Sequence, residues 1–326
     1  MCAIFGFLDY KQEVQHRTMK KLLRVLSVES EARGKDATGF AYVACDNIIV
    51  YKAAKPAHKL HLYCPVNTKC VIGHTRMATQ GTPENNINNH PFTGIAGETN
   101  FALAHNGVIY NDLGLRKSKA LPPTKIHTDS YIATQLLEAS NALDFESIKS
   151  MAETVEGTFS FTILDDKNNL FLVKGDNPLF LAHFEKIGLY VYASTESIFT
   201  KAILRTKLRH EPFSKIEVNS GDILKIDIQG NMEKSKFDNW YSSFLFSTRM
   251  PYNWSFATNQ TPTENTHLDE LVELGSFVGV SREEISALFE LGFSLFEIEQ
   301  LLYEPDLLRE QLSSAYEEES DFCFDY

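Results

Sequence analysis

The hydrophobic positions of the chain follow two kinds of repeat. An apolar residue at every third or fourth position, typical of an amphipathic helix, recurs among Lys and Arg over residues 16–31. Similar patterns predict helices over 128–138, 145–154 and 196–204. Short apolar or alternating runs, typical of strands, are more numerous. Strands are expected at 1–8, 40–44, 48–52, 71–76, 101–107, 158–164, 170–174, 179–182, 189–193, 215–218 and 222–228.

Many strands with helices set between them predict two packed β-sheets with helices on the outside. After about residue 236 the pattern changes. Residues 237–265 are rich in aromatic side chains without clear periodicity, and Ser281–Glu284 forms a capping box before further helical spacing. The end of the chain is acidic. We therefore expect one domain over 1–236 and, over 237–326, an aromatic-rich connector, a helical extension and an acidic tail.

Composition narrows the functional classes. A 326-residue chain with 43% hydrophobic residues can bury a sizeable core, and its net charge of −12 argues against direct binding of nucleic acid. The apolar start is too short for a signal peptide or a membrane span, so a cytoplasmic protein without a membrane partner is expected.

Cysteines and histidines show no metal-ligand spacing, so we expect no metal and no cofactor. His74, His90 and His127 are interpreted as structural rather than catalytic. The cysteines are odd in number and irregularly spaced, which indicates reduced thiols. They are Cys2, Cys45, Cys64, Cys70 and Cys323.

Cys2 is the first candidate for chemistry. A small residue after the initiator methionine favours removal of Met1, which would leave a thiol and an α-amine on Cys2. The thiolate is a strong nucleophile, and an amine that titrates near pH 8 can act as its general base. The alternative is that Cys2 is simply the buried start of a strand.

A series of short motifs follows Cys2 in a particular order and spacing. They are Met1-Cys2-Ala3-Ile4-Phe5-Gly6, Arg33-Gly34-Lys35-Asp36-Ala37-Thr38-Gly39, Gly73-His74-Thr75-Arg76-Met77-Ala78-Thr79-Gln80-Gly81, Asn89-His90-Pro91-Phe92, His105-Asn106-Gly107-Val108-Ile109-Tyr110-Asn111, Thr128-Asp129-Ser130 and Glu156-Gly157. Over residues 1–230 the series resembles the glutaminase domain of class II, or N-terminal-nucleophile (Ntn), glutamine amidotransferases. The resemblance implies an α+β fold, a four-layer αββα Ntn-hydrolase sandwich of two antiparallel sheets.

The resemblance also implies catalytic roles. Members cleave the side-chain amide of glutamine through a γ-glutamyl thioester on the cysteine and release ammonia. Cys2 matches the nucleophile, and its freed amine matches the base. Asn106, through its side-chain NH₂, and Gly107, through its backbone N–H, match the oxyanion hole. In isolation, His105-Asn106-Gly107 also reads as an ordinary Asn-Gly turn.

Binding of the amino-acid end of glutamine needs a cation and an anion. Arg76 matches the family's ligand for the α-carboxylate, and Asp129 its ligand for the α-ammonium. A surface salt bridge and a helix cap are the alternatives for these two residues. Thr79 and the loop predicted after it, over 80–93, match the segment that covers glutamine, and Gly81 would supply the mobility of that segment. Arg33 matches an arginine beside the catalytic turn and is expected to give structural support.

Three positions depart from the family pattern. Ala3 stands where many members have glycine, Met77 replaces a common tryptophan and Gln80 replaces a common histidine. None is a nucleophile or an oxyanion donor. These departures put loop closure and coupling to a second site in doubt, rather than amide cleavage.

The acceptor of the ammonia is not evident in residues 237–326. They carry no pyrophosphatase, phosphoribosyl-binding or sugar-isomerase loop and no phosphate cradle. We therefore expect L-glutamine and a separate synthase subunit as partners, and homo-oligomerisation is left open. The helical pattern over 288–302 resembles small ubiquitin-associated modules. A helical extension packed on the sandwich or on a partner is the alternative.

Three functional readings follow. The first is a glutamine-hydrolysing enzyme that supplies ammonia, which the joint presence of Cys2, Asn106, Gly107, Arg76 and Asp129 favours. The second is a non-catalytic scaffold or sensor, favoured if Met1 is retained. The third is the same nucleophile acting on another amide.

Overall fold

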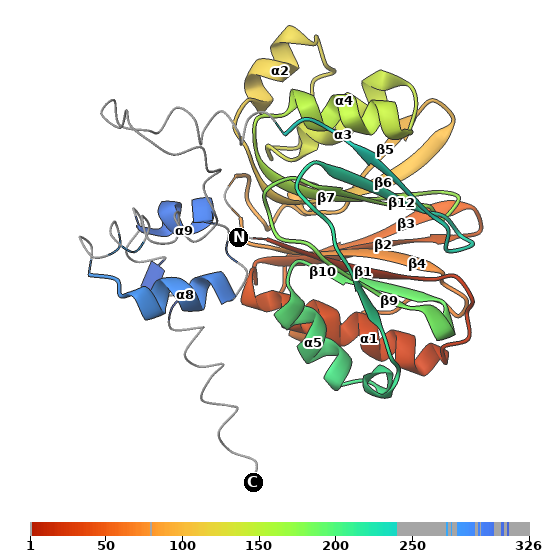
Figure 1. Ribbon diagram of the computed structural model, residues 1–326. Coiled ribbons are helices and arrows are strands. Elements are labelled where there is room, and N and C mark those ends of the chain that lie inside the picture. Colours follow the sequence, from red (N-terminus) through yellow and green to blue (C-terminus); the bar gives the residue numbers. More distant parts are fainter. Residues whose placement is uncertain are drawn as a thin grey trace, which may run out of the picture. The chain divides into compact units, whose positions relative to one another are not determined.

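A computed structural model describes residues 2–78 and 80–239, and beyond them residues 272, 275, 279–290, 293, 295–302, 308, 309 and 312. The chain separates into two compact units, Met1–Leu245 and Phe246–Tyr326. Both sheets belong to the first unit (Figure 1).

Two antiparallel sheets form the centre of the first unit. The seven-stranded sheet has the order β11-β9-β10-β1-β4-β2-β3, and the six-stranded sheet has the order β13-β12-β8-β7-β6-β5. The strands of the first are β1 Ala3–Asp9, β2 Ala37–Ala44, β3 Asn47–Ala53, β4 Cys70–Arg76, β9 Phe180–Phe184, β10 Leu189–Ala193 and β11 Ser214–Ile216. Those of the second are β5 Phe92–Ala96, β6 Thr99–Ile109, β7 Gly157–Asp165, β8 Leu170–Lys174, β12 Asp222–Ile226 and β13 Met232–Lys236.

Helices cover the outer face of each sheet (Figure 1). The α-helices of this unit are α1 His16–Glu29, α2 Asp112–Ser118, α3 Tyr131–Ser140, α4 Phe145–Thr154 and α5 Glu196–Leu204. The short 3₁₀ helices are η1 Ser30–Ala32, η2 Ala57–Lys59, η3 Asn86–Asn88, η4 Glu185–Ile187 and η5 Lys207–His210. Helices α1 and α5 lie on the seven-stranded sheet, and α3 and α4 lie on the six-stranded sheet. The predicted four-layer αββα sandwich is confirmed.

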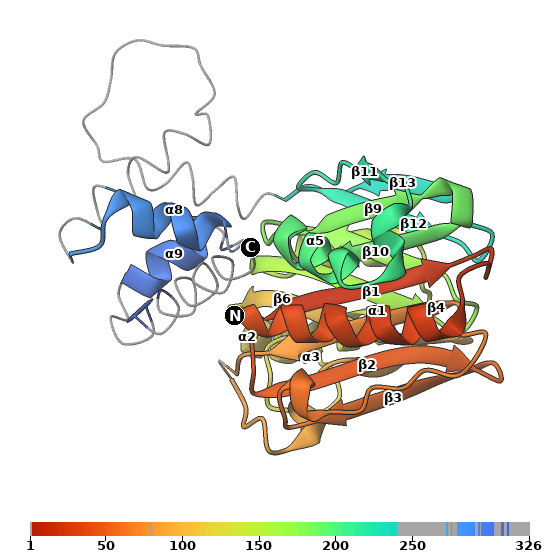
Figure 2. The ribbon, with the colours of Figure 1, turned by 90° about the horizontal axis from the view of Figure 1, so that it is seen from below.

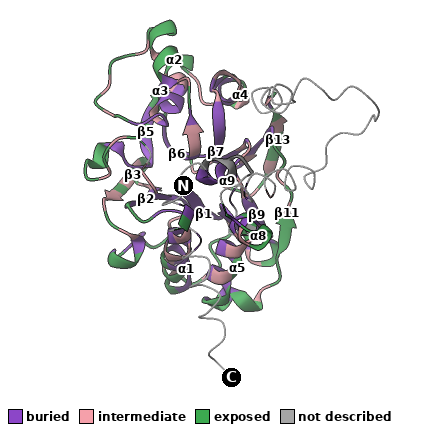
Figure 3. Ribbon diagram, turned by 90° about the vertical axis from the view of Figure 1, so that its left-hand side faces the viewer, coloured by how far each residue is buried: buried purple, intermediate pink, exposed green. Residues whose placement is uncertain are grey.

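Strand β1 shows how the sequence builds these layers. Phe5 and Phe7 point toward α1 and belong to the outer core, whereas Ile4 and Leu8 point into the core between the sheets. This alternation lets one strand bury both of its faces, and each large apolar side chain so buried contributes about 1.5–3 kcal/mol. β1 is also central within its sheet, because Phe5 pairs with both Ala193 of β10 and Gly73 of β4. The interior strands are buried and edge strand β11 is exposed (Figure 3).

The direction of α1 matters for the site. α1 follows the end of β1 and runs back along the seven-stranded sheet, packed beside α5 (Figure 2). Its last turn leads through η1 to Arg33, which contacts Cys2. The first turn of α1 therefore lies at the opposite end of β1 from Cys2, about 21 Å away along the helix.

Three elements depart from the prediction. β5, α2 and β13 occupy segments for which the sequence indicated loop or no element. β5 and β13 are the two edge strands of the six-stranded sheet. Their weak hydrophobic alternation reflects that position, since an edge strand pairs on one side only.

Two helices are described in the second unit, α8 Arg282–Glu290 and α9 Leu295–Leu302. The predicted capping box is confirmed: the Glu284 N–H donates to Ser281 Oγ (3.2 Å) and the Ser281 N–H donates to Glu284 Oε2 (2.7 Å). Within the described part of the chain, no helix is long and apolar enough to cross a membrane.

Candidate active site

Cys2 stands immediately before β1, at the end of a central strand. Its side chain is half-buried, and Sγ lies 3.5 Å from the carbonyl oxygen of Met77. The buried guanidinium of Arg33 donates from Nε to the carbonyl oxygen of Cys2 (3.1 Å). Arg33 thus fixes the main chain that carries the thiol, in keeping with the supporting role expected of it.

Burial and nearby charges, among them those of Arg76 and Asp129, affect the ionisation of Cys2. Burial raises the pKa of the Cys2 thiol; the positive charge of Arg76 opposes that rise and the negative charge of Asp129 adds to it. Both charges are therefore close enough to act on the thiol. A thiol with a raised pKa stays protonated at neutral pH, so it needs a base before it can attack.

Asn106 and Gly107 lie in β6, on the other sheet. The Asn106 side chain is 0% exposed, and neither its Nδ2 nor its Oδ1 has a hydrogen-bond partner among the described residues. Buried amide groups are usually hydrogen-bonded, so a free amide donor in this position calls for a functional explanation. The main chain of Asn106 is held instead by Asn177, whose Nδ2 donates to the Asn106 carbonyl oxygen (2.8 Å).

Gly107 is required by the backbone rather than merely tolerated. Its φ is +140°, and a Cβ at this position would lie 1.9 Å from the carbonyl oxygen of Thr158. Any other residue would force β6 away from β7. The Asn-Gly pair is thus part of a strand, not the isolated turn that was the alternative reading.

A hydrogen bond between the sheets brings Asn106 to the same end of the sandwich as Cys2. His74 in β4 donates from Nε2 to the carbonyl oxygen of His105 in β6 (3.0 Å), and His105 directly precedes Asn106. His74 itself lies opposite Ile4 of β1, two residues after Cys2.

Arg76, at the end of β4, is buried and held by the loop that follows it. Nη1 donates to Asn89 Oδ1 (2.7 Å), and Nη2 donates to the carbonyl oxygens of Gln80 and Gly81, the latter at 2.9 Å. Burial lowers the pKa of the guanidinium. Two of these three acceptors are loop carbonyls, which a carboxylate could replace with a stronger, charge-assisted bond.

Asp129 lies just before α3 but is not its N-cap. Ser130 holds that position and makes no side-chain capping bond, so the alternative reading of Asp129 as a helix cap is wrong. The Asp129 carboxylate instead accepts the Ile109 N–H at Oδ2 (2.7 Å). Asp129 is buried, which raises its pKa, and the bond ties it to β6 two residues beyond Gly107.

The loop after Arg76 is anchored at several points. Gly81 has a φ of +70°, and Asn88 accepts the His127 N–H at Oδ1 (2.9 Å). Gln80 is exposed. Thr79, predicted to cover glutamine, lies outside the described residues.

Three buried histidines lie behind these groups. The rings of His74 and His90 are 4.1 Å apart between centroids, and those of His90 and His105 are 6.4 Å apart. Burial lowers the pKa of all three, that of His105 to about 3, so they are neutral at physiological pH. Within residues 2–78 and 80–239, no group of three or more His, Cys, Asp or Glu is placed to hold a metal ion. His127 is exposed.

The predicted residues Arg76 and Asp129 are therefore within electrostatic range of the Cys2 thiol, and Asn106 and Gly107 lie at the same end of the sandwich. Asn177 was not predicted. Its sequence context, Gly175-Asp176-Asn177-Pro178, indicates only a turn, and nothing local signals that its side chain reaches a residue 71 positions away.

Comparisons with known proteins identify the kind of domain that the chain contains. Residues 74–201 match the family described as a glutamine amidotransferase domain. A glutamine–fructose-6-phosphate aminotransferase (isomerizing) of Staphylococcus aureus is 30% identical over 245 residues, which cover 71% of this chain and 38% of that protein. A 7-cyano-7-deazaguanine synthase 2 of Sulfurisphaera tokodaii is 27% identical over 242 residues, covering 70% and 51% respectively. The chain thus spans about half, or less, of these relatives.

Solved structures show the same fold. A glutamine phosphoribosylpyrophosphate amidotransferase from B. subtilis superposes with a TM-score of 0.57 at 21% identity, over 73% of this chain and 49% of that one. Two packed antiparallel sheets between helices, with a cysteine at the start of a central strand, define an Ntn-hydrolase fold. The resemblance to glutamine amidotransferases that the motif order indicated is confirmed by the domain match over residues 74–201. That match supports an enzymatic role.

Proposed function

We propose that this protein hydrolyses the side-chain amide of glutamine through a γ-glutamyl thioester on Cys2 and supplies the ammonia to an acceptor on a separate subunit. The observation that carries the proposal is the free, buried amide of Asn106 at the same end of the sandwich as the Cys2 thiol. A donor without a protein partner is available to an oxyanion that forms during reaction.

The α-carboxylate of glutamine would bind Arg76. In the free protein Nη2 donates to the Gln80 and Gly81 carbonyls, so the incoming carboxylate would displace these two bonds and release the loop to move. The α-ammonium would bind Asp129, whose buried carboxylate acts electrostatically on both the thiol and the guanidinium. Arg76 and Asp129 favour a free amino acid over a substrate without that head group.

The reaction then has two covalent stages, formation of the thioester and its hydrolysis. The Cys2 α-amine, freed by removal of Met1, takes the thiol proton while Sγ forms a bond to the amide carbon. The oxyanion is stabilised by Asn106 Nδ2 and the Gly107 N–H. The C–N bond breaks, and the nitrogen leaves with the proton as ammonia. Water then attacks the thioester, the C–S bond breaks, and glutamate leaves with the thiol restored.

The first experiment joins intact mass with glutamate release from glutamine, for the natural chain, for Cys2→Ala and for Cys45→Ala. Cys45 is an exposed thiol in the β2–β3 turn and serves as the matched control. Loss of Met1, together with release that Cys2→Ala abolishes and Cys45→Ala leaves intact, is the expected result.

Retained Met1 with no release, even with a co-expressed synthase, would overturn the proposal in favour of a binding role. Release from another amide but not from glutamine would overturn the choice of substrate alone. Transfer to a separate subunit is tested by whether ammonia-dependent synthesis by a copurifying partner becomes glutamine-dependent when this chain is added.

A further inference from the structure

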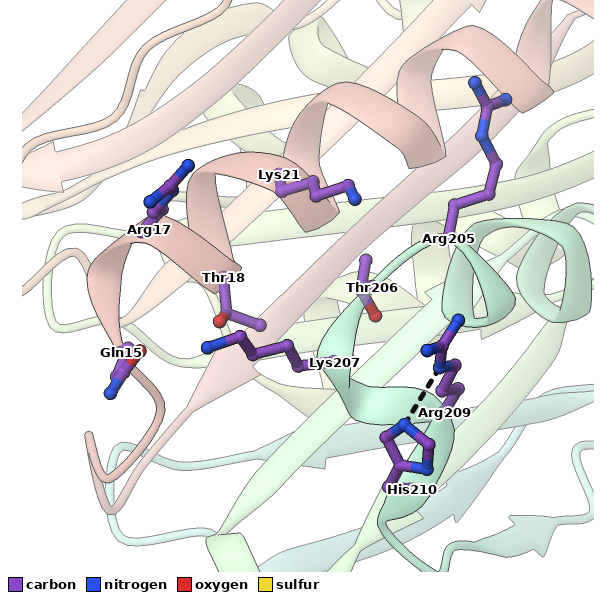
Figure 4. Close-up of a pocket in the computed structure, with 9 residues that line it drawn as sticks. All are labelled: Gln15, Arg17, Thr18, Lys21, Arg205, Thr206, Lys207, Arg209 and His210. Carbon is purple, nitrogen blue, oxygen red and sulfur yellow. Dashed lines mark hydrogen bonds between the residues drawn. The ribbon is translucent and has the colours of Figure 1, made fainter.

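A second concave site lies at the opposite end of β1 from Cys2. A hollow of about 380 Å³ opens between the first two turns of α1 and the short helix η5 (Figure 4). Its walls carry Arg17 and Lys21 from α1, and Lys207 and Arg209 from η5. Its volume is within the range of small-molecule sites.

The folding pattern explains why these cations converge. α1 buries Thr18, Met19 and Leu22 against the sheet, which leaves Arg17 and Lys21, four residues apart, on one outer face. In η5 only Leu208 is buried, and the residues on either side of it, Lys207 and Arg209, are turned outward.

Three of the cations that line the hollow are not neutralised by an ion pair. Arg17, Lys21 and Lys207 form none with any residue in 2–78 or 80–239. Arg205, which also lines the hollow, is paired with Glu29, and Glu211 is paired with Lys186. A cluster of unpaired cations is notable in a chain whose net charge is −12.

The same cluster is unfavourable for the helix that carries it. The first turn of α1 has no acidic residue, and Gln15 at the N-cap makes no side-chain capping bond. A cation in the first turn opposes the helix dipole, and Arg17 and Lys21 repel each other at i, i+4. An anion in the hollow would reverse both effects.

Thr18 adds a hydroxyl to the wall of the hollow. The residue is 8% exposed and lines the hollow, its hydroxyl makes no hydrogen bond with any described residue, and its oxygen is not among the fully buried polar atoms (Figure 4). The hydroxyl is therefore accessible to a ligand in the hollow. A phosphate oxygen in the hollow would accept from Thr18 and from the surrounding cations.

We propose that this hollow binds the di- or triphosphate group of a soluble metabolite. Four cationic side chains and a helix N-terminus suit a ligand with several negative charges better than a single carboxylate. An adjoining hollow of about 830 Å³ shares Lys21 with the first and is lined by the exposed ring of Tyr63 and by Val28. It provides room for an organic remainder. The site is distinct from the glutamine site and does not depend on its assignment.

The test is calorimetric titration of the full chain with tripolyphosphate, ATP and adenosine at low and at physiological salt. Tripolyphosphate and ATP are expected to bind, more weakly as salt rises, and adenosine is not. The double substitution Lys21→Gln/Lys207→Gln should weaken tripolyphosphate binding by about 10-fold or more.

A matched control removes the same charge elsewhere. Lys119→Gln/Lys167→Gln changes two exposed lysines outside both hollows and should leave binding unchanged. Thr18→Val, which replaces the hydroxyl with a methyl of the same size, should weaken binding without loss of helix content. Equal weakening by both double variants would overturn the proposal, because binding would then be a response to net charge. Absence of saturable binding by any phosphate compound would also overturn it, and would turn attention to an acidic protein surface as the occupant.

Discussion

At one end of β1, Arg76 and Asp129 are buried and each is held by hydrogen bonds from neighbouring segments. At the other end, Arg17, Lys21 and Lys207 reach into solvent and form no ion pair with the described residues. The two groups differ in whether the fold holds the charged side chains in place before a ligand binds.

This difference determines what kind of ligand each end can recognise. Buried and fixed groups lose little freedom when a ligand binds and can discriminate by geometry, as a catalytic site must. Exposed, flexible cations give up side-chain freedom on binding and respond mainly to charge and salt. Six substitutions test this difference.

The largest effect is expected at Asn106. Asn106→Ala should lower kcat for glutamine hydrolysis by about 10²–10³-fold, because it removes an oxyanion donor. The free energy of unfolding should change by only about 1 kcal/mol or less, since neither polar atom of the side chain has a partner among the described residues. Steady-state kinetics and urea unfolding on one preparation check both.

Asn177→Ala tests the support of the Asn106 main chain and is compared with Asn106→Ala. It removes the donor to the Asn106 carbonyl and should lower stability by about 1–3 kcal/mol, in addition to any loss of activity. Full activity in Asn106→Ala would contradict the assignment of this residue to the oxyanion hole.

The next effect concerns Arg76. Arg76→Lys should reduce kcat/KM for glutamine by about 10–100-fold, mainly through KM, because an ammonium cannot reproduce the planar fork that contacts Asn89 and the loop. The control is Arg205→Lys, which makes the same exchange in the wall of the cationic hollow and should leave kcat/KM for glutamine unchanged. Equal kinetics in the two variants would remove Arg76 from glutamine binding.

A smaller effect is expected in the pH dependence of stability. Burial lowers the pKa of His105 to about 3, against about 6.5 in the unfolded chain. Between these values the unfolded state binds one more proton, so this histidine's contribution to stability is present above about pH 6.5 and is lost as pH falls. The slope is about 1.4 kcal/mol per pH unit.

The contribution of His105 to that slope is the difference between the natural protein and His105→Gln in how the free energy of unfolding changes with pH. Asp9, whose pKa burial raises to about 6, acts in the opposite direction in both proteins and cancels from the difference. Urea unfolding at several pH values between about 4 and 7 measures it. Parallel stability curves for the two proteins would show that His105 takes up no extra proton on unfolding.

The smallest effect on stability is expected at Arg17, in the cationic hollow. Arg17→Glu places an acid in the first turn of α1 and should raise the free energy of unfolding by about 0.3–1 kcal/mol. The same change should abolish tripolyphosphate binding and leave glutamate release unaltered. A destabilised Arg17→Glu variant would mean that Arg17 serves the fold, contrary to the comparison above.

The sequence predicted those elements whose hydrophobic pattern is decided locally. The bounds of α4, β8 and α5 agree residue by residue, since each is an apolar run between clear turn or capping signals. α2 was missed because only Asp112 among its residues is buried, so it has no apolar stripe. β5 was missed because its Phe-Thr-Gly-Ile-Ala sequence follows an Asn- and Pro-rich loop.

At the site, residue types were predictable and their partners were not. Motif spacing indicated Cys2, Asn106 and Asp129, but the bond from Ile109 to Asp129 joins segments 20 residues apart. The bond from Asn177 to Asn106 joins segments still farther apart. Such contacts depend on how two sheets stack, which no local pattern of hydrophobic residues specifies.

The central position of β1 orders events during synthesis. Cys2 is synthesised well before most of the residues that surround it, because its strand pairs with β4 and with β10, and the Ile4 N–H donates to Ser194 Oγ across 190 residues. The thiol therefore stays outside a formed site until β10 has emerged and closed the sheet around it.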